Sequence, residues 1–107
     1  QINRPQFTLL ALYEYGNLLL HQQQIENAES TFREMLNEVL AGSQELFALA
    51  QYGLARVEAL KGNLLEAQRL GEASVVTLET LNFRNAREVR DWFDTLISRI
   101  SKNDRRE

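Results

Sequence analysis

The stretch LYEYGNLLLHQQQIENAESTFREML, from Leu12 to Leu36, decides the fold that this 107-residue chain is expected to adopt. Its first half places apolar or small residues at the spacing i, i+3, i+4, i+7, which marks one face of an α-helix: Leu12, Tyr15, Gly16 and Leu19. Its second half continues this spacing through Ile25, Ala28, Phe32, Met35 and Leu36. The stretch therefore predicts a hairpin of two amphipathic helices.

Helical spacing extends outward from this stretch over the rest of the chain, and no segment alternates with the two-residue period of a strand. Residues that favour helix starts or ends divide the chain at Pro5, Gly42, Ser43, Gly62, Asn63, Asn82 and Asn85. Asn63 and Asn85 each precede a Glu by three residues, which is the spacing of a capping box. The predicted helices span about 5–22, 25–41, 44–61, 64–80 and 85–101.

These helices predict one all-α domain over residues 1–107. Connections of two to four residues make neighbouring helices antiparallel. The expected parts are a hairpin at about 5–41, a second hairpin at about 44–80, a closing helix at about 85–101 and a tail at 102–107. A composition of 44% hydrophobic and 25% charged residues is that of a globular protein.

The two hairpins repeat one another at a distance of 39 residues. This shift superposes Tyr13 on Tyr52, Gly16 on Ala55, Ala28 on Ala67 and Leu36 on Val75. Small residues are needed where two helices cross closely, so we assign Gly16, Ala28, Ala55 and Ala67 to these crossings. The turn at Gln23-Gln24 has no glycine and no strong cap, and the repeat alone places it there.

The residues of both units resemble the tetratricopeptide repeat family, over about residues 9–81. The first unit carries the resemblance at Leu12, Tyr15, Gly16, Leu19, Ala28, Phe32 and Met35, and the second at Leu54, Ala55, Gly62, Asn63, Glu66, Ala67 and Ser74. The sequence departs from the family pattern at four positions. Gln51 and Glu58 stand where the family prefers bulky apolar residues, and Gly71 stands where it prefers an aromatic residue. Gln23 stands where the family has a glycine in the turn. The resemblance implies antiparallel hairpins stacked as a right-handed solenoid.

The second half has a narrower resemblance. Residues 62–74, GNLLEAQRLGEAS, are similar to the last repeat of large bacterial signalling ATPases and of maltose-regulator-type transcription activators. Residues 86–93, AREVRDWF, are similar to the helix that closes that repeat. The resemblance implies a sensor or partner platform in a cytoplasmic regulator whose nucleotide-binding domain lies elsewhere. Because the chain starts with Gln1 rather than Met, we expect it to be part of a longer protein.

In such a solenoid the first helix of each hairpin lines a concave surface that holds partner segments. The resemblance places five side chains there: Tyr13, Asn17, His21, Tyr52 and Arg56. Tyr offers contact area, Asn can pair with a peptide backbone and Arg can grip a carboxylate. Each can equally be an ordinary, partly exposed helix residue. The predicted partner is a protein, a peptide or another domain of the parent chain. Chaperone tails are not expected, because Tyr13 stands where the family's clamp has a lysine.

No catalytic residue, metal site or cofactor is expected, so the chain is not predicted to be an enzyme. His21 is the single histidine and no cysteine is present, which excludes a histidine-based relay and thiolate chemistry. Asp91 and Asp94 lie one turn apart but alternate with Arg87 and Arg90, which is typical of a solvated face.

Nucleic acid and membrane are not expected partners. The net charge is −3, and the apolar runs are far shorter than the ~20 residues that cross a bilayer. Trp92 and Phe93 beside two arginines could form an aromatic platform for single strands. Their helical spacing instead assigns them to the buried stripe of the closing helix, with Trp92 packed against the second hairpin.

The alternative to partner binding is a structural segment that packs within its parent or against a second copy. The first helix carries more apolar residues than one hairpin partner can hide: Phe7, Leu9, Leu10, Leu12, Tyr13, Leu18, Leu19 and Leu20. A homodimer through this helix is therefore a further expectation.

The chain is expected neither to bind nor to hydrolyse ATP, because it has no glycine-rich phosphate loop followed by Lys. Isothermal titration of ATP with Mg²⁺ into the protein should give no saturable heat. Stoichiometric binding would contradict the assignment of this chain to a platform rather than a switch domain.

Overall fold

The computed structural model describes residues 6–39 and 43–105, and its regular structure in these ranges is helical throughout. The helices are α1 (Gln6–His21), α2 (Ile25–Glu38), α3 (Gln44–Leu60), α4 (Leu64–Thr80) and α5 (Ala86–Arg105). The predicted all-α fold is confirmed for the described part. None of its helices combines the length and the apolar character needed to cross a membrane.

The helix ends differ from the predicted ones at two places. Helix α2 stops at Glu38 rather than at 41, because Val39 leaves helical geometry with φ −70° and ψ 127°. Helix α5 runs to Arg105 rather than to 101, so most of the predicted tail is helical. Pro5 and Gly42, which we expect at a helix start and a helix end, lie outside the described residues.

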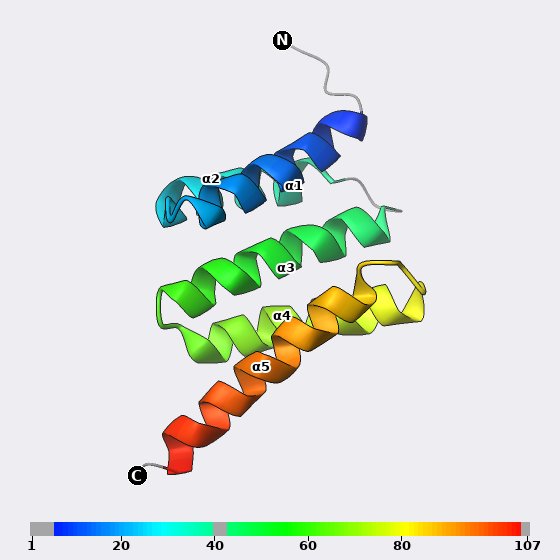
Figure 1. Ribbon diagram of the computed structural model, residues 1–107. Helices are drawn as coiled ribbons and strands as arrows, with labels where there is room; N and C mark the ends of the chain where they lie inside the picture. Colours follow the sequence, from blue (N-terminus) through cyan, green and yellow to red (C-terminus); the bar gives the residue numbers. More distant parts are fainter. Residues whose placement is uncertain (1–5, 40–42, 106–107) are drawn as a thin grey trace.

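The helices form two hairpins and a crossing helix (Figure 1). Helices α1 and α2 pack together, and α3 and α4 form the most extensive pair. Helix α3 contacts both α2 and α1, so the second hairpin lies against the first. Helix α5 packs on α4 and runs obliquely across the second hairpin, so that α1 and α5 lie at opposite ends of the molecule.

The three short turns share one hydrogen-bond pattern. In each, a backbone N–H reaches the carbonyl five residues earlier: Gln24 to Leu19, Asn63 to Glu58 and Phe83 to Leu78. The residue before the donor has positive φ in every case, 63° at Gln23, 89° at Gly62 and 55° at Asn82. This is the left-handed helix end that Gly and Asn favour. The turn placed at Gln23-Gln24 by the repeat is therefore present, with Gln in the strained position.

The predicted capping box at Asn63 is not formed. Asn63 occupies the N-cap of α4, but its side chain makes no capping hydrogen bond. Its amide donates instead to Glu58 Oε1 at 2.7 Å. Glu58 is only 6% exposed, and Arg33 Nη2 lies 3.9 Å from its Oε2. The buried carboxylate is therefore held by polar neighbours.

The two hairpins meet around the ring of Phe32, which has no exposed surface. A Cβ added to Gly16 on α1 would lie 2.5 Å from Phe32 Cζ, and one added to Gly53 on α3 would lie 2.4 Å from Phe32 Cδ1. The ring therefore occupies space that only two glycines leave free. The other residues assigned to crossings, Ala28, Ala55 and Ala67, also have no exposed surface.

Gly71 makes room on α4 for aromatic rings of α5. It is the register equivalent of Phe32, 39 residues further on. A Cβ there would lie 2.9 Å from Phe93 Cδ1 and 3.1 Å from Trp92 Cζ3. The aromatic rings at this level come from α5 instead, and the missing side chain on α4 makes room for them.

Gly53→Ala is expected to lower the free energy of unfolding by about 1–3 kcal/mol, because the new Cβ overpacks the Phe32 ring. In a helix without such a contact, Gly→Ala raises the free energy of unfolding by up to ~1 kcal/mol. A decrease would therefore show that the new Cβ has no room. Urea unfolding followed by circular dichroism measures it. In a Phe32→Leu background the loss should shrink; an equal loss in both backgrounds would show that the ring is not the obstacle.

Candidate functional site

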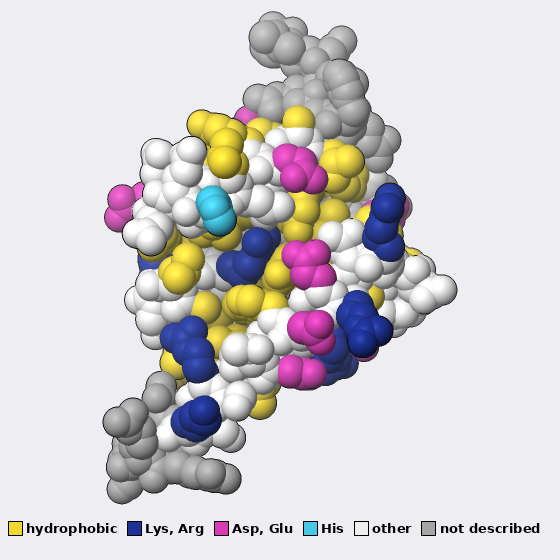
Figure 2. Space-filling model, in the orientation of Figure 1, with side chains coloured by type: hydrophobic (Ala, Val, Ile, Leu, Met, Phe, Trp, Pro, Cys, Tyr) yellow, Lys and Arg dark blue, Asp and Glu magenta, His cyan; other side chains and the backbone are white. Residues whose placement is uncertain are grey.

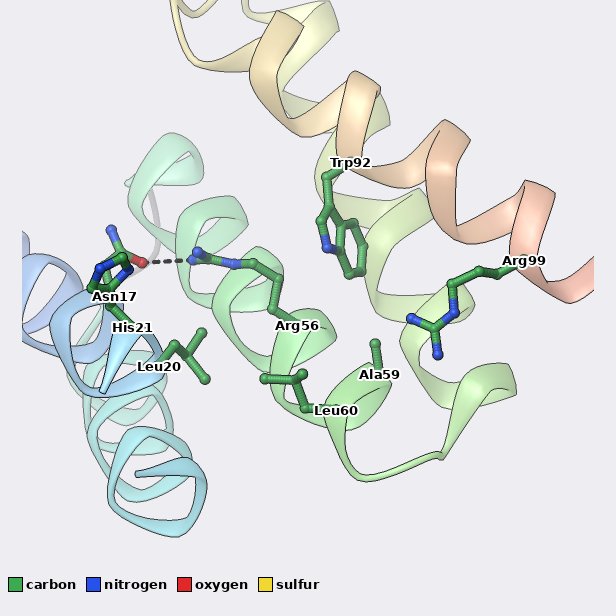
Figure 3. A pocket seen from close by; sticks show the side chains of 8 residues that line it. All are labelled: Asn17, Leu20, His21, Arg56, Ala59, Leu60, Trp92 and Arg99. Atoms are coloured by element: carbon green, nitrogen blue, oxygen red, sulfur yellow. Dashed lines mark hydrogen bonds between the residues drawn. The ribbon is translucent and has the colours of Figure 1, made fainter. Parts of the chain in front are cut away.

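A groove of about 320 Å³ is lined by side chains of α1, α3 and α5 (Figure 3). The lining residues are Asn17, Leu20, His21, Arg56, Ala59, Leu60, Trp92 and Arg99. Those of α1 and α3 are the same positions of the repeat, because a shift of 39 residues carries Asn17, Leu20 and His21 onto Arg56, Ala59 and Leu60. Helices α2 and α4 contribute no lining residue.

Arg56 lies at the centre of this groove, between the two hairpins. Its guanidinium carbon lies 4.0 Å from the centroid of the Tyr52 ring, and its Nη2 donates to Asn17 Oδ1 at 2.7 Å. The rings of Phe32 and Tyr13 lie 5.8 Å and 6.0 Å from the same carbon. A guanidinium over an aromatic face is attracted by the partial negative charge of the π-electron cloud. The cation is therefore fixed in position before any ligand arrives.

The lining contains two arginines and no carboxylate. Among the described residues, neither Arg56 nor Arg99 forms an ion pair with Asp or Glu. Figure 3 shows Arg56 reaching from α3 towards Asn17, and Trp92 and Arg99 reaching from α5 towards α3. Leu60 is 56% exposed and adds apolar surface between the two cations. The groove thus combines uncompensated positive charge with apolar contact area.

The surroundings of the groove are of mixed charge. Figure 2 shows hydrophobic surface on this face, with basic side chains and the single histidine near it and a row of acidic side chains to one side. Burial raises the pKa of both Tyr13 and Tyr52, and the negative charge of Glu88, in the first turn of α5, adds a smaller contribution in the same direction. A ligand therefore meets positive charge at the centre of the groove and negative charge beside it.

Three of the five predicted contact residues line the groove, namely Asn17, His21 and Arg56. Tyr13 and Tyr52 do not, because they are only 4% and 3% exposed. Tyr13 packs against Phe32 with 6.2 Å between ring centroids, and Tyr52 is covered by Arg56 and by the Trp92 ring. The expectation that the tyrosines offer contact area is corrected: they form the base on which Arg56 rests.

Trp92 of the closing helix packs against the second hairpin as predicted, but it is less buried than we expect from the sequence. It is partly buried, with its ring edge-on to Tyr52 at 5.6 Å, but it also lines the groove. Sequence reasoning missed Leu20, Ala59, Leu60 and Arg99. The repeat could have identified Ala59 and Leu60 as the equivalents of Leu20 and His21, whereas nothing local in the sequence aims Arg99 at this groove.

Within the described ranges, no group of three or more His, Cys, Asp or Glu side chains is placed to hold a metal ion. Comparison of the chain with models of known protein families, with curated proteins and with solved structures finds no match. Function is therefore inferred from the groove itself.

The stability of the fold should depend on the Tyr52 phenol above pH 10. Burial raises the pKa of Tyr52 from 10.0 to about 12, against the opposing effect of Arg56. A raised folded-state pKa means that the stabilisation is complete below about pH 10 and is lost as pH rises from about 10 to about 12. Urea unfolding at stepped pH should show this fall, and Tyr52→Phe should remove part of it. If the free energies of unfolding of the unmodified protein and of Tyr52→Phe differ by the same amount from pH 10 to pH 12, the expectation is contradicted.

Proposed function

We propose that the chain is a protein-binding helical-repeat module of the tetratricopeptide kind, which holds a segment of another protein or of its own parent in the groove between α1, α3 and α5. One observation carries this proposal. Equivalent positions of the two hairpins, 17, 20 and 21 and then 56, 59 and 60, line one continuous groove. A repeat protein that presents the same positions of successive units on one surface has the architecture of an extended binding face.

The groove favours an acidic segment that carries an apolar residue. Arg56 and Arg99 have no carboxylate partner among the described residues, so a carboxylate of the ligand can accept their hydrogen bonds. Trp92 and the exposed Leu60 provide contact for an apolar side chain. Asn17 accepts from Arg56 through Oδ1, and its side chain also interacts with the Tyr13 phenol, so it is held in place at the edge of the groove.

The orientation of the ligand follows from the charge around the groove. Arg99 is in the second half of α5, and Glu88 is in its first turn. Carboxylates of the segment should therefore lie towards Arg99, and a basic or neutral part should lie towards Glu88. Because the segment loses conformational freedom on binding, an affinity in the ~micromolar range is expected.

We further propose that the parent protein is a cytoplasmic bacterial signalling or transcription regulator. The support is the resemblance of residues 62–74 and 86–93 to the closing repeat of such proteins, together with the position of α5 over the second hairpin. In that setting the groove receives either a partner protein or another domain of the same chain.

Peptides selected from a random display library should be enriched in Asp or Glu next to a large apolar residue. A selected peptide should bind Arg99→Gln about tenfold more weakly, because a charge-assisted hydrogen bond is lost. Arg69→Gln is the matched control, since Arg69 lies on α4, outside the groove, and pairs with Glu66. Fluorescence polarisation measures the binding. Enrichment of basic peptides, or an equal effect of Arg69→Gln, would contradict the proposal.

A further inference from the structure

Arg56 differs from the basic side chains that form ion pairs in this structure. Arg33, Lys61, Arg69 and Arg90 each pair with a carboxylate. Arg56 is partly buried between the hairpins, yet within the described ranges it pairs with none. A charge that is withdrawn from water is usually paired with an opposite charge. The group that takes the place of a carboxylate beside Arg56 therefore shows what this position is built for.

That group is the side-chain amide of Asn17. Nη2 of Arg56 donates to Asn17 Oδ1 at 2.7 Å. A carboxylate at position 17 could accept the same hydrogen bond and would hold the guanidinium more strongly, because the bond would be charge-assisted at both ends. The amide oxygen accepts the hydrogen bond but carries no net charge. Asn17 thus fixes the guanidinium and leaves its positive charge uncancelled.

The two side chains are each held in place by a buried tyrosine one helical turn earlier. Tyr13 precedes Asn17 by four residues, and Tyr52 precedes Arg56 by four, at equivalent positions of the repeat. The guanidinium carbon lies 4.0 Å from the centroid of the Tyr52 ring, and Nε lies 3.5 Å from the Tyr52 carbonyl oxygen. The Asn17 side chain interacts with the Tyr13 phenol. The orientation of Arg56 is therefore set from two sides before a ligand enters.

These contacts leave one end of the guanidinium open. Nη1 of Arg56 donates to no acceptor in the part of the chain that the structure describes. Glu88 acts on both tyrosine phenols through its charge, but it forms no ion pair with Arg56. Arg56 lines the groove, where Figure 3 shows it extended from α3 towards Asn17. A carboxylate in the groove can accept from Nη1 while Asn17 keeps Nη2 in place.

We propose that Arg56 selects a carboxylate in the bound segment and that Asn17 is its positioning residue, which holds the guanidinium through a neutral oxygen so that its charge stays available. This inference rests on the function proposed above and deepens it, because it assigns one acidic side chain of the ligand to Arg56. It also has a consequence for position 17. A carboxylate introduced there would pair with Arg56 inside the protein and compete with the ligand.

The test varies the peptide together with the protein. Each Asp or Glu of a selected acidic peptide is replaced in turn by its amide, and fluorescence polarisation measures binding to the unmodified 107-residue chain and to Asn17→Asp. For at least one position, the amide peptide should bind the unmodified chain about tenfold more weakly than the acidic peptide. For the same position, this difference should shrink to less than about twofold in Asn17→Asp, because the introduced carboxylate already holds Arg56.

Two further variants separate charge from structure. Asn37→Asp is the matched control, because it makes the same chemical change at an exposed residue of α2, and α2 contributes no side chain to the groove. It should keep the tenfold preference for the acid. Asn17→Ala removes the oxygen without adding charge, so the acidic peptide should bind several-fold more weakly and the amide peptide equally well. Circular dichroism checks that each variant is folded, and Asn17→Ala decides the question if Asn17→Asp does not fold.

Three results would overturn the assignment of Asn17 while the groove still binds acidic peptides. These are an undiminished preference for the acid in Asn17→Asp, an equal loss of preference in Asn37→Asp, and a loss of affinity in the position 17 variants that is the same for acidic and amide peptides. The last result would give Asn17 a purely structural role. If no acidic peptide is selected at all, the function proposed above fails and this inference fails with it. The two failures are distinguishable, because only the first leaves binding to the unmodified chain intact.

Discussion

The packing of the Phe32 ring between Gly16 and Gly53 is the constraint on which the rest of the structure depends. The ring belongs to α2, and the two glycines belong to α1 and α3. A single side chain therefore fixes both the crossing within the first hairpin and the contact between the hairpins. It also forms part of the aromatic base, with Tyr13 and Tyr52, on which the Arg56 guanidinium rests.

The groove is a consequence of this packing repeated once. Because the second hairpin follows the first in the same register, position 17 and position 56 come to lie within hydrogen-bond distance, and Asn17 accepts from Arg56. The repeat ends after the second hairpin. At the position where the first hairpin has Phe32, the second has Gly71, and Phe93 and Trp92 of α5 occupy the space that this glycine leaves. Helix α5 closes the second hairpin and supplies the third wall of the groove.

The groove for which we propose a partner has a definite physical character. The groove has positive charge held in place by aromatic rings, and its selectivity comes from carboxylates of the ligand.

The sequence by itself determined the five helices, the 39-residue repeat and the left-handed turns at Gly62 and Asn82, because these depend on periodicity and on the conformational range of single residues. It also placed Asn17, His21 and Arg56 on one surface, and these three side chains line the groove. Only the tertiary structure decided that Tyr13 and Tyr52 are buried, that Trp92 and Arg99 line the groove, and that Gly71 receives the rings of α5. The reason is physical, because helical periodicity shows only which side chains share a face of a helix. Whether another helix covers that face depends on the angle at which the two helices cross. This angle is set by the volumes of side chains that are far apart in the chain.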